Sequence, residues 1–256
     1  MVAQKNQHKK IGLALGGGAV LGAAHVGVLR AVKELDISLD YISGTSIGAF
    51  VAALYAFGLD WEEIGQIASK LKWMDISSIS PSRYGLLSND KLATLIKEHI
   101  GEKRIEEARI PLSIISTDIT TGQKIVLDKG PVAQAIMAST CIPGIYKPVE
   151  IKGKMLVDGG IMENVPVETV REMGANYVIG VDLNATHSYH KPKNILDVLV
   201  NSFHFLIQQS NKPQTESADL LIQPDLDEFS KSDISQVDKL MERGYDASVE
   251  ALGKAF

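Results

Sequence analysis

The chain of 256 residues is poor in cysteine, in positive charge and in long apolar runs. Its single cysteine, Cys141, excludes an intramolecular disulfide and is typical of a reducing compartment, so we expect a cytoplasmic location. Lysines and arginines number 26 against 31 aspartates and glutamates, for a formal net charge of -5, which argues against binding nucleic acid through counterion release. No apolar run is long enough to cross a bilayer, and residues 1–10 are not followed by the apolar core of a signal peptide, so we expect neither feature.

Patterns that would hold a metal ion or a nucleotide are also missing. There is no second cysteine and no H-E-x-x-H sequence, so we expect no metal and no cofactor. The glycine-rich stretch 16–22 departs from the G-x-G-x-x-G spacing of dinucleotide-binding loops. Asp36 and Asp40, the acids that follow it, precede the next strand, whereas an acid that binds ribose should end that strand. A nucleotide-binding role is therefore disfavoured.

What the chain does contain is typical of a globular α/β protein, with 45% apolar and 22% charged residues. A strand, a loop and a helix follow one another twice near the start, with the first strand at 11–15 and the second helix at 47–57. This alternation favours a mainly parallel sheet covered by helices. We expect one domain over residues 1–256, with a motif-bearing core at about 11–183 and further helices and an edge strand at about 190–256.

Residues 75–88 are rich in serine, proline and glycine and predict a loop. Tyr84 and Leu86 place apolar side chains in it. The segment either packs onto the core or forms a lid or rim at a substrate site. After it, Asn89 or Asp90 is a candidate cap for a helix that runs to His99, and a further helix is expected at 195–209.

The stretch Gly44-Thr45-Ser46-Ile47-Gly48 lies between a predicted strand and the apolar helix pattern that starts at Ile47. A serine between two glycines at such a junction is the pattern of a nucleophile elbow, in which Gly44 and Gly48 keep the turn uncrowded. The start of the helix offers unpaired N–H groups and the positive end of its dipole. We hypothesise that Ser46 is a nucleophile; the alternative is a structural turn in which Ser46 caps the helix.

A serine nucleophile needs a base, and histidines are poorly placed for that role. His187 and His190 lie in a polar loop without flanking glycines, and His204 lies in the middle of a predicted helix. His25 is within the first helix pattern, where we expect a packed or half-exposed side chain. Any of the three later histidines would complete a Ser–Asp–His order, but none has the expected local setting.

Asp158 is the better candidate for the base. It ends an apolar strand and is followed by Gly159 and Gly160, which leave its carboxyl group uncrowded. A carboxylate that is partly desolvated has a raised pKa and can accept a proton from a serine hydroxyl. The alternative is a turn aspartate that binds its own backbone.

Together these motifs resemble those of the patatin-like phospholipases. Stretch 16–22 resembles the oxyanion loop of that family, stretch 44–48 its elbow, and Asp158-Gly159-Gly160 its Asp-Gly-Gly motif. Residues 116–122 and 135–144 are similar to further stretches of bacterial members. The five motifs follow in the family's order over about two thirds of the chain.

The resemblance implies a three-layer α/β/α fold, related to but distinct from that of the usual α/β hydrolases. It also implies a carboxylic ester hydrolase of the phospholipase, lysophospholipase or esterase type, acting on lipid or other acyl esters. Ser46 would form an acyl-serine intermediate and Asp158 would be the base, with no histidine. The backbone N–H groups of Gly17, Gly18 and Ala19 would form the oxyanion hole. Membrane contact would be peripheral and depend on apolar residues.

Leu21 departs from the family pattern, which usually carries a basic residue just before the last glycine of the loop. We hypothesise that its effect falls on substrate choice, with less preference for charged phospholipids over neutral esters. Two other functions stay open: a regulatory or scaffold protein with little catalysis, and an acyltransferase that uses the same serine.

Overall fold

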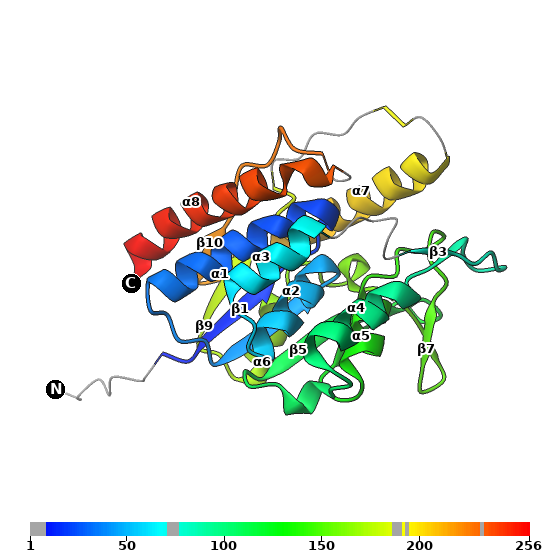
Figure 1. The fold of residues 1–256 in the computed structure, drawn as a ribbon, viewed down its shortest axis with the longest axis horizontal. Coiled ribbons are helices and arrows are strands. Elements are labelled where there is room, and N and C mark those ends of the chain that lie inside the picture. The colour runs from blue at the N-terminus through cyan, green and yellow to red at the C-terminus, as the bar shows by residue number, and fades with distance from the viewer. Residues whose placement is uncertain (1–8, 71–76, 186–190, 193–194, 231–232) are drawn as a thin grey trace.

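The computed structural model describes residues 9–70, 77–185, 191–192, 195–230 and 233–256 (Figure 1). His187 and His190, two of the alternative bases, lie outside these described residues, as do the first two residues of the predicted loop 75–88.

Among the described residues, eight strands form one sheet in the order β10-β9-β1-β2-β5-β8-β7, with β6 paired to β5. The strands of this sheet are β1 (Ile11–Leu15), β2 (Tyr41–Thr45), β5 (Leu112–Asp118), β6 (Gln123–Leu127), β7 (Val149–Ile151), β8 (Lys154–Asp158), β9 (Tyr177–Val181) and β10 (Leu220–Ile222). Strands β10, β9, β1, β2 and β5 are parallel neighbours. Strands β6 and β8 are antiparallel to β5, and β7 is antiparallel to β8, so the sheet is mixed but mainly parallel.

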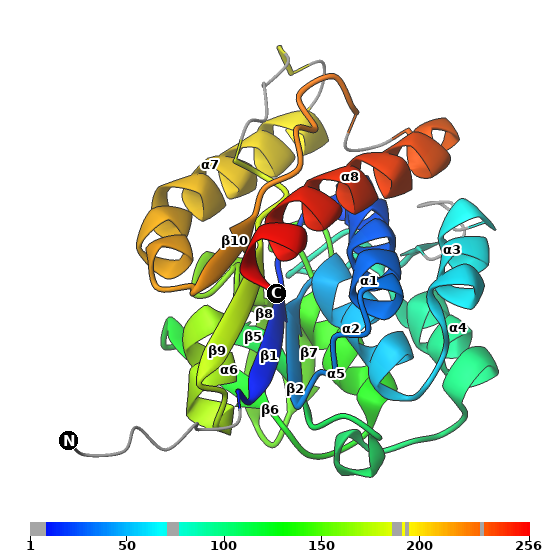
Figure 2. The same cartoon turned by 90° about the vertical axis from the view of Figure 1, so that its left-hand side faces the viewer.

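Helices cover both faces of this sheet (Figure 2). They are α1 (Ala24–Glu34), α2 (Ile47–Ala56), α3 (Trp61–Lys70), α4 (Asp90–Ile100), α5 (Val132–Ser139), α6 (Val167–Met173), α7 (Ile195–Glu216) and α8 (Val237–Ala255), with 3-10 turns η1 (Ala19–Ala23), η2 (Ile105–Glu107), η3 (Gly159–Ile161) and η4 (Ile234–Gln236). Helices α1, α2 and α3 lie on one side, and α6 and α7 on the other. The predicted three-layer α/β/α class is confirmed.

Side chains of β1 alternate between the two helical layers. Leu13 and Leu15 belong to the main core with α1 and α2, whereas Ala14 packs with Val170 of α6. A Cβ atom on Gly12 would lie 2.1 Å from Val170 Cγ1, so the small residues of β1 let α6 approach closely. No helix in the described part of the chain combines the length and hydropathy of a membrane span.

Three local expectations need correction. Segment 77–88 is not purely a loop, because β3 (Ser78–Ile79) and β4 (Leu87–Ser88) form a small antiparallel pair. Asn89 makes no capping bond, since its amide donates instead to Met137 O and Thr140 Oγ1. Helix α7 runs beyond residue 209 to Glu216, with Pro213 inside it. For Asn89 and α7, contacts that are distant in sequence outweigh the local pattern.

Strands β2 and β8 meet end to end along one edge of β5. Thr45, the last residue of β2, pairs with Ile115, and Asp158, the last residue of β8, pairs with the next residue, Ser116. Strand β6 occupies the other edge at the same positions. Because β8 runs opposite to β2, their carboxyl ends converge, which brings Asp158 to Ser46 although more than a hundred residues separate them.

Candidate active site

Ser46 lies at a sharply strained turn between β2 and α2. Its φ of 54° and ψ of -124° are unusual for a residue with a side chain, and such strain is common at functional positions. A Cβ atom on Gly44 would lie 2.3 Å from Gly48 O, and one on Gly48 would lie 2.2 Å from Leu15 O, so only glycine fits either place. The Ser46 side chain makes no helix-capping bond, and the geometry is therefore that of a nucleophile elbow rather than of a serine N-cap.

Neighbouring elements hold this elbow in place. The Ser46 N–H donates to Ser139 Oγ of α5 at 2.8 Å, and Thr45 Oγ1 donates to Glu163 O at 2.8 Å. The backbone orientation of Ser46 is thus fixed from two sides, which leaves its hydroxyl group as the part that can act on a ligand.

Asp158 is fully buried at the end of β8. Its Oδ1 accepts a bond of 2.8 Å from the Gly160 N–H, whereas its Oδ2 has no hydrogen-bond partner of standard geometry among the described residues. Burial raises the pKa of the carboxyl group from 3.8 to about 7, partly offset by the Gly160 N–H and by the Ser46 hydroxyl beside it. The turn-aspartate alternative is correct for Oδ1, whereas Oδ2 is not used by the turn. The carboxyl group as a whole has a pKa near neutral pH and lies beside the Ser46 hydroxyl.

The two glycines after Asp158 allow close packing around it. A Cβ atom on Gly159 would lie 2.4 Å from Ile115 O, and one on Gly160 would lie 2.9 Å from the Ile207 side chain. Cys141 lies nearby, with its O accepting from the Asp158 N–H at 2.8 Å. Burial, and then the Asp158 charge, raise the pKa of the Cys141 thiol strongly, so this thiol is not a reactive nucleophile.

The glycine-rich loop lies beside Ser46, as expected: a Cβ atom on Gly17 would lie 3.2 Å from Ser46 Cβ. The Gly17 N–H donates to Asn164 Oδ1 at 3.1 Å, so it is already engaged. In contrast, the N–H groups of Gly18 and Ala19 donate no hydrogen bond among the described residues. Of the three predicted oxyanion donors, these two are available to a ligand.

Further polar side chains that sequence reasoning missed fix this loop. Asn184 Nδ2 donates to Gly17 O at 2.7 Å, and His25 Nε2 donates to Gly16 O at 2.7 Å. Burial lowers the pKa of His25 to about 4, so the ring is neutral and serves as a brace. The first contact joins residues 167 positions apart and the second joins residues nine apart, and neither corresponds to a local sequence pattern.

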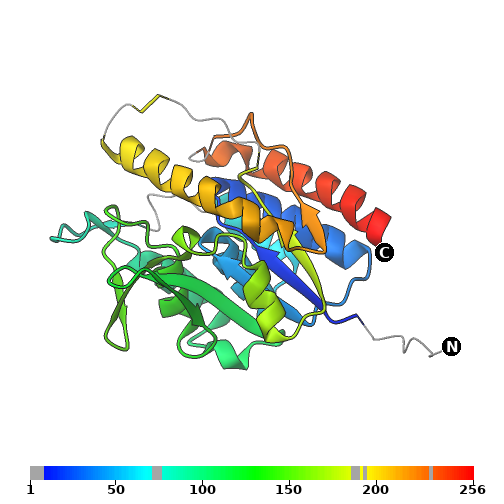
Figure 3. The same cartoon turned by 180° about the vertical axis from the view of Figure 1, so that it is seen from behind.

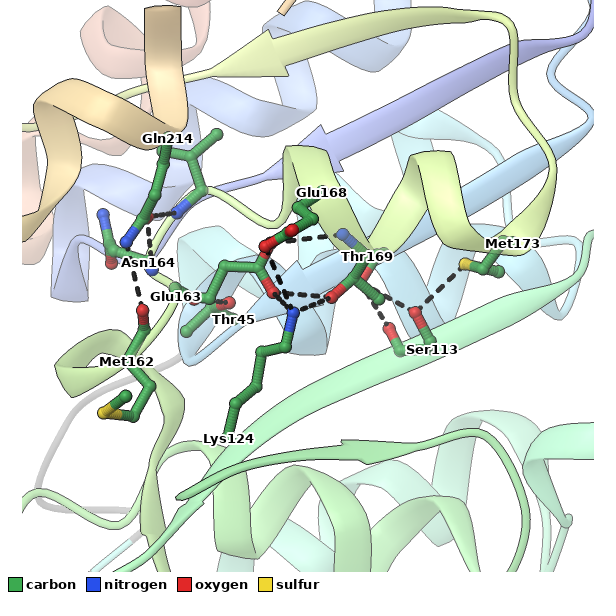
Figure 4. Close-up of polar contacts among 12 residues, drawn as sticks. Thr45, Ser113, Lys124, Met162, Glu163, Asn164, Glu168, Thr169, Met173 and Gln214 are labelled. Carbon is green, nitrogen blue, oxygen red and sulfur yellow. Dashed lines mark hydrogen bonds and ion pairs between the residues drawn. The ribbon is translucent and has the colours of Figure 1, made fainter. Parts of the chain in front are cut away.

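The turn 162–165 connects the motifs to α7 and to β6 (Figure 4). Gln214 accepts from the N–H groups of Asn164 and Val165 and donates to Met162 O. The buried Glu163 carboxylate forms an ion pair with Lys124 Nζ at 3.1 Å, and the Glu163 backbone carbonyl accepts a hydrogen bond from the Thr45 hydroxyl. One turn therefore contacts the elbow through Glu163 and the glycine loop through Asn164.

A pocket opens above Ser46 and Asp158. Its apolar lining includes Ile47, Phe50, Leu92, Ile142, Tyr146, Phe203 and Ile207. Its polar lining includes Asn89, Thr140, Asn184 and His204. His204 thus reaches the pocket although it lies mid-helix, whereas Leu21 is fully buried in the main core away from this lining.

A second apolar cavity adjoins the first. The two share Ala19, Ile47 and Phe50, and the second continues past Val51 and Ala68. Among the described residues, no group of three or more His, Cys, Asp and Glu side chains is placed to hold a metal ion.

Solved structures define the class of fold. VipD from Legionella pneumophila superposes with a TM-score of 0.66 at 14% identity, over 96% of this chain and 67% of that chain. The ExoU–SpcU complex of Pseudomonas aeruginosa gives a TM-score of 0.53 at 17% identity, over 97% of this chain and 52% of that chain. At these identities the likeness shows the fold alone.

The family follows from the sequence comparison. The family model for patatin-like phospholipase matches residues 13–171, and this chain belongs to that family. An uncharacterised NTE family protein of Mycobacterium tuberculosis is 33% identical over 182 residues, which are 70% of this chain and 50% of that protein. Lysophospholipase NTE1 of Candida glabrata is 31% identical over 253 residues, 96% of this chain and 14% of that protein. The chain spans about half the length of the mycobacterial relative.

Proposed function

We propose that this protein is a serine acyl hydrolase that cleaves lipid carboxyl esters with Ser46 as nucleophile and Asp158 as base. The observation that carries this proposal is the end-to-end meeting of β2 and β8. It brings a strained serine and a buried carboxyl group of raised pKa to one point of the sheet edge.

In the first half of the reaction, Asp158 Oδ2 accepts the Ser46 hydroxyl proton while Ser46 Oγ attacks the ester carbonyl carbon. The N–H groups of Gly18 and Ala19 stabilise the negative charge on the carbonyl oxygen. The N–H of Ile47, the first residue of α2, lies at the positive end of the helix dipole, which favours negative charge near Ser46. The alcohol leaves with the proton held by Asp158, and the acyl group stays on Ser46.

In the second half, Asp158 accepts a proton from a water molecule that attacks the acyl carbon. The fatty acid departs, and the proton returns to Ser46 Oγ. Five glycines support this chemistry sterically, because a Cβ atom would collide with backbone at positions 44, 48 and 159 and with the side chains of Asn164 and Ile207 at positions 17 and 160.

The pocket lining supports a substrate with an apolar acyl chain. The two cavities share Ala19, Ile47 and Phe50 in their lining, and we infer that an acyl chain runs from Ser46 past these residues along α2 toward Ala68 of α3. The name of the fungal relative, a lysophospholipase, agrees with this substrate class.

A fluorophosphonate probe, which attaches to an activated serine, tests the proposal together with hydrolysis of nitrophenyl butyrate. We expect wild type to be labelled and active, Ser46→Ala to be neither, and Ser69→Ala, an exposed serine of α3, to behave as wild type. Folded wild-type protein that takes no label would favour the scaffold alternative. Transfer of the acyl group to added glycerol in preference to water would favour the acyltransferase.

A further inference from the structure

Exposed large apolar side chains are concentrated on two segments of the described chain. Seven of the twelve lie on segment 77–88 or on α7: Ile79, Tyr84, Leu86, Ile195, Val198, Phe205 and Leu206. Ile79 is 86% exposed and Ile195 is 72% exposed, values that are unusual for isoleucine in a folded protein.

Both segments are attached to the walls of the Ser46 pocket. In segment 77–88, the N–H groups of Leu86 and Leu87 donate to Ile145 O, and the Ser77 and Tyr146 hydroxyls share a hydrogen bond of 2.6 Å. Tyr146 itself lines the pocket. The exposed apolar residues of this segment therefore stand at the edge of the pocket.

Helix α7 is apolar on two faces. Phe203 and Ile207 are buried and line the pocket. At 100° per residue, Val198 and Leu206 lie on a different face, and Leu206 is 59% exposed. A helix that only covers a core carries polar residues on its outer face, so this second apolar face calls for a separate explanation.

The two segments lie at the same end of the molecule. In Figures 1 and 3 the β3 hairpin and the amino-terminal end of α7 project at one end, opposite the end where the carboxyl terminus lies. Helix α7 lines the pocket directly, through Phe203 and Ile207, whereas segment 77–88 is hydrogen-bonded through Ser77 to Tyr146, which also lines it.

Acidic side chains are scarce on these two segments. The chain carries 31 aspartates and glutamates, yet residues 77–88 contain none and α7 contains only Asp197 and Glu216, near its two ends. Arg83 is exposed on the hairpin. A lipid surface therefore meets little negative charge from these two segments, and the exposed Tyr84 has the apolar ring and polar tip that suit a membrane interface.

We propose that the surface formed by Ile79, Tyr84 and Leu86 of the hairpin and by the outer face of α7 docks onto a lipid layer. Docking in this orientation would place the opening of the Ser46 pocket next to the lipid layer that contains the ester substrate. This inference rests on the proposed function for the identity of the substrate. The attachment is apolar rather than electrostatic, so it persists at high salt.

Sedimentation with phosphatidylcholine vesicles tests the docking surface without any turnover. In a Ser46→Ala background, we expect Ile79→Ser and Leu206→Ser each to lower the vesicle partition coefficient at least fivefold. Leu35→Ser, at an exposed leucine that follows α1, should leave the partition coefficient unchanged. Sodium chloride at 0.5 M should not release the parent protein.

The second measurement is hydrolysis of soluble nitrophenyl butyrate by proteins that keep Ser46 and carry Ile79→Ser or Leu206→Ser. We expect their rates to stay within twofold of the wild-type rate. Vesicle binding that is absent, insensitive to both substitutions or abolished by salt would overturn the docking surface. A dimer in light scattering that Leu206→Ser dissociates would overturn it in favour of self-association. If the wild type hydrolyses no ester while Ile79→Ser still lowers vesicle binding, the docking surface stands and the hydrolase proposal fails.

Discussion

Replacement of Asp158 by asparagine should abolish activity and at the same time stabilise the fold at neutral and alkaline pH. The carboxyl group is fully buried and its pKa is raised from 3.8 to about 7. At 1.36 kcal/mol for each pH unit, ionised Asp158 costs the native state about 4 kcal/mol. Asparagine has no charge to bury, and its carbonyl oxygen can still accept the Gly160 N–H.

The direction of the pH effect follows from proton binding. Because the pKa is higher in the folded than in the unfolded protein, the native state holds more protons between pH 3.8 and about 7. The wild type therefore loses stability as pH rises through this range, whereas the amide group introduced by Asp158→Asn does not titrate. The free energy of unfolding of Asp158→Asn relative to wild type should therefore grow by roughly 2–3 kcal/mol between pH 5 and pH 8.

Urea unfolding of wild type and Asp158→Asn at pH 5 and pH 8 gives the free energy of unfolding of each protein at each pH. Effects of the substitution that do not depend on pH cancel when the stability difference at pH 5 is subtracted from that at pH 8. Asp90→Asn, at an exposed aspartate of α4, is the control and should show no such growth. Activity of the wild type should fall about fiftyfold from pH 7 to pH 5, because the base must be ionised. A constant stability difference, or activity that is level over this range, would refute the assignment of Asp158 as a buried base.

Three further outcomes can be measured. Gly48→Ala places a Cβ atom 2.2 Å from a β1 carbonyl oxygen and should lower the free energy of unfolding by about 3 kcal/mol or more, whereas Gly253→Ala, in open space on α8, should change it by at most about 1 kcal/mol. Asn164→Ala removes the oxygen that accepts the Gly17 N–H; it should slow fluorophosphonate labelling about tenfold and lower the free energy of unfolding by about 1–3 kcal/mol. An unchanged labelling rate would show that Asn164 does not support the site. Ala68→Trp fills the second cavity and should lower kcat/KM for a nitrophenyl palmitate at least tenfold but not for the butyrate, while Ala251→Trp, which lines neither cavity, should alter neither value.

Much of the fold was predictable because its signals are local. Strand β1 and helix α5 begin and end where the apolar and breaker residues place them. The elbow was visible as well, since a serine can adopt a φ of 54° there only with small residues at positions 44 and 48. Asp158 was identifiable as an acid at a strand end followed by glycines.

The supports of the site could not be predicted in the same way. Asn164 contacts Gly17 across 147 positions, and Gln214 contacts Asn164 across 50. An asparagine or glutamine has the same local preferences whether it lies on the surface or braces a loop. The extension of α7 to Glu216, past Pro213, likewise accompanies contacts with the turn 162–165 that no window of sequence contains.

The sequence by itself therefore determined the class of fold and the two residues proposed for the chemistry, because strand ends and glycine turns are set by nearby residues. Only the tertiary structure decided how those residues act. The meeting of β2 and β8 on β5 brings Asp158 to Ser46, and burial at that point raises its pKa. The engagement of the Gly17 N–H by Asn164 leaves Gly18 and Ala19 as the available donors. Desolvation and hydrogen-bond pairing depend on which segments pack together, and distant parts of the chain supply those segments.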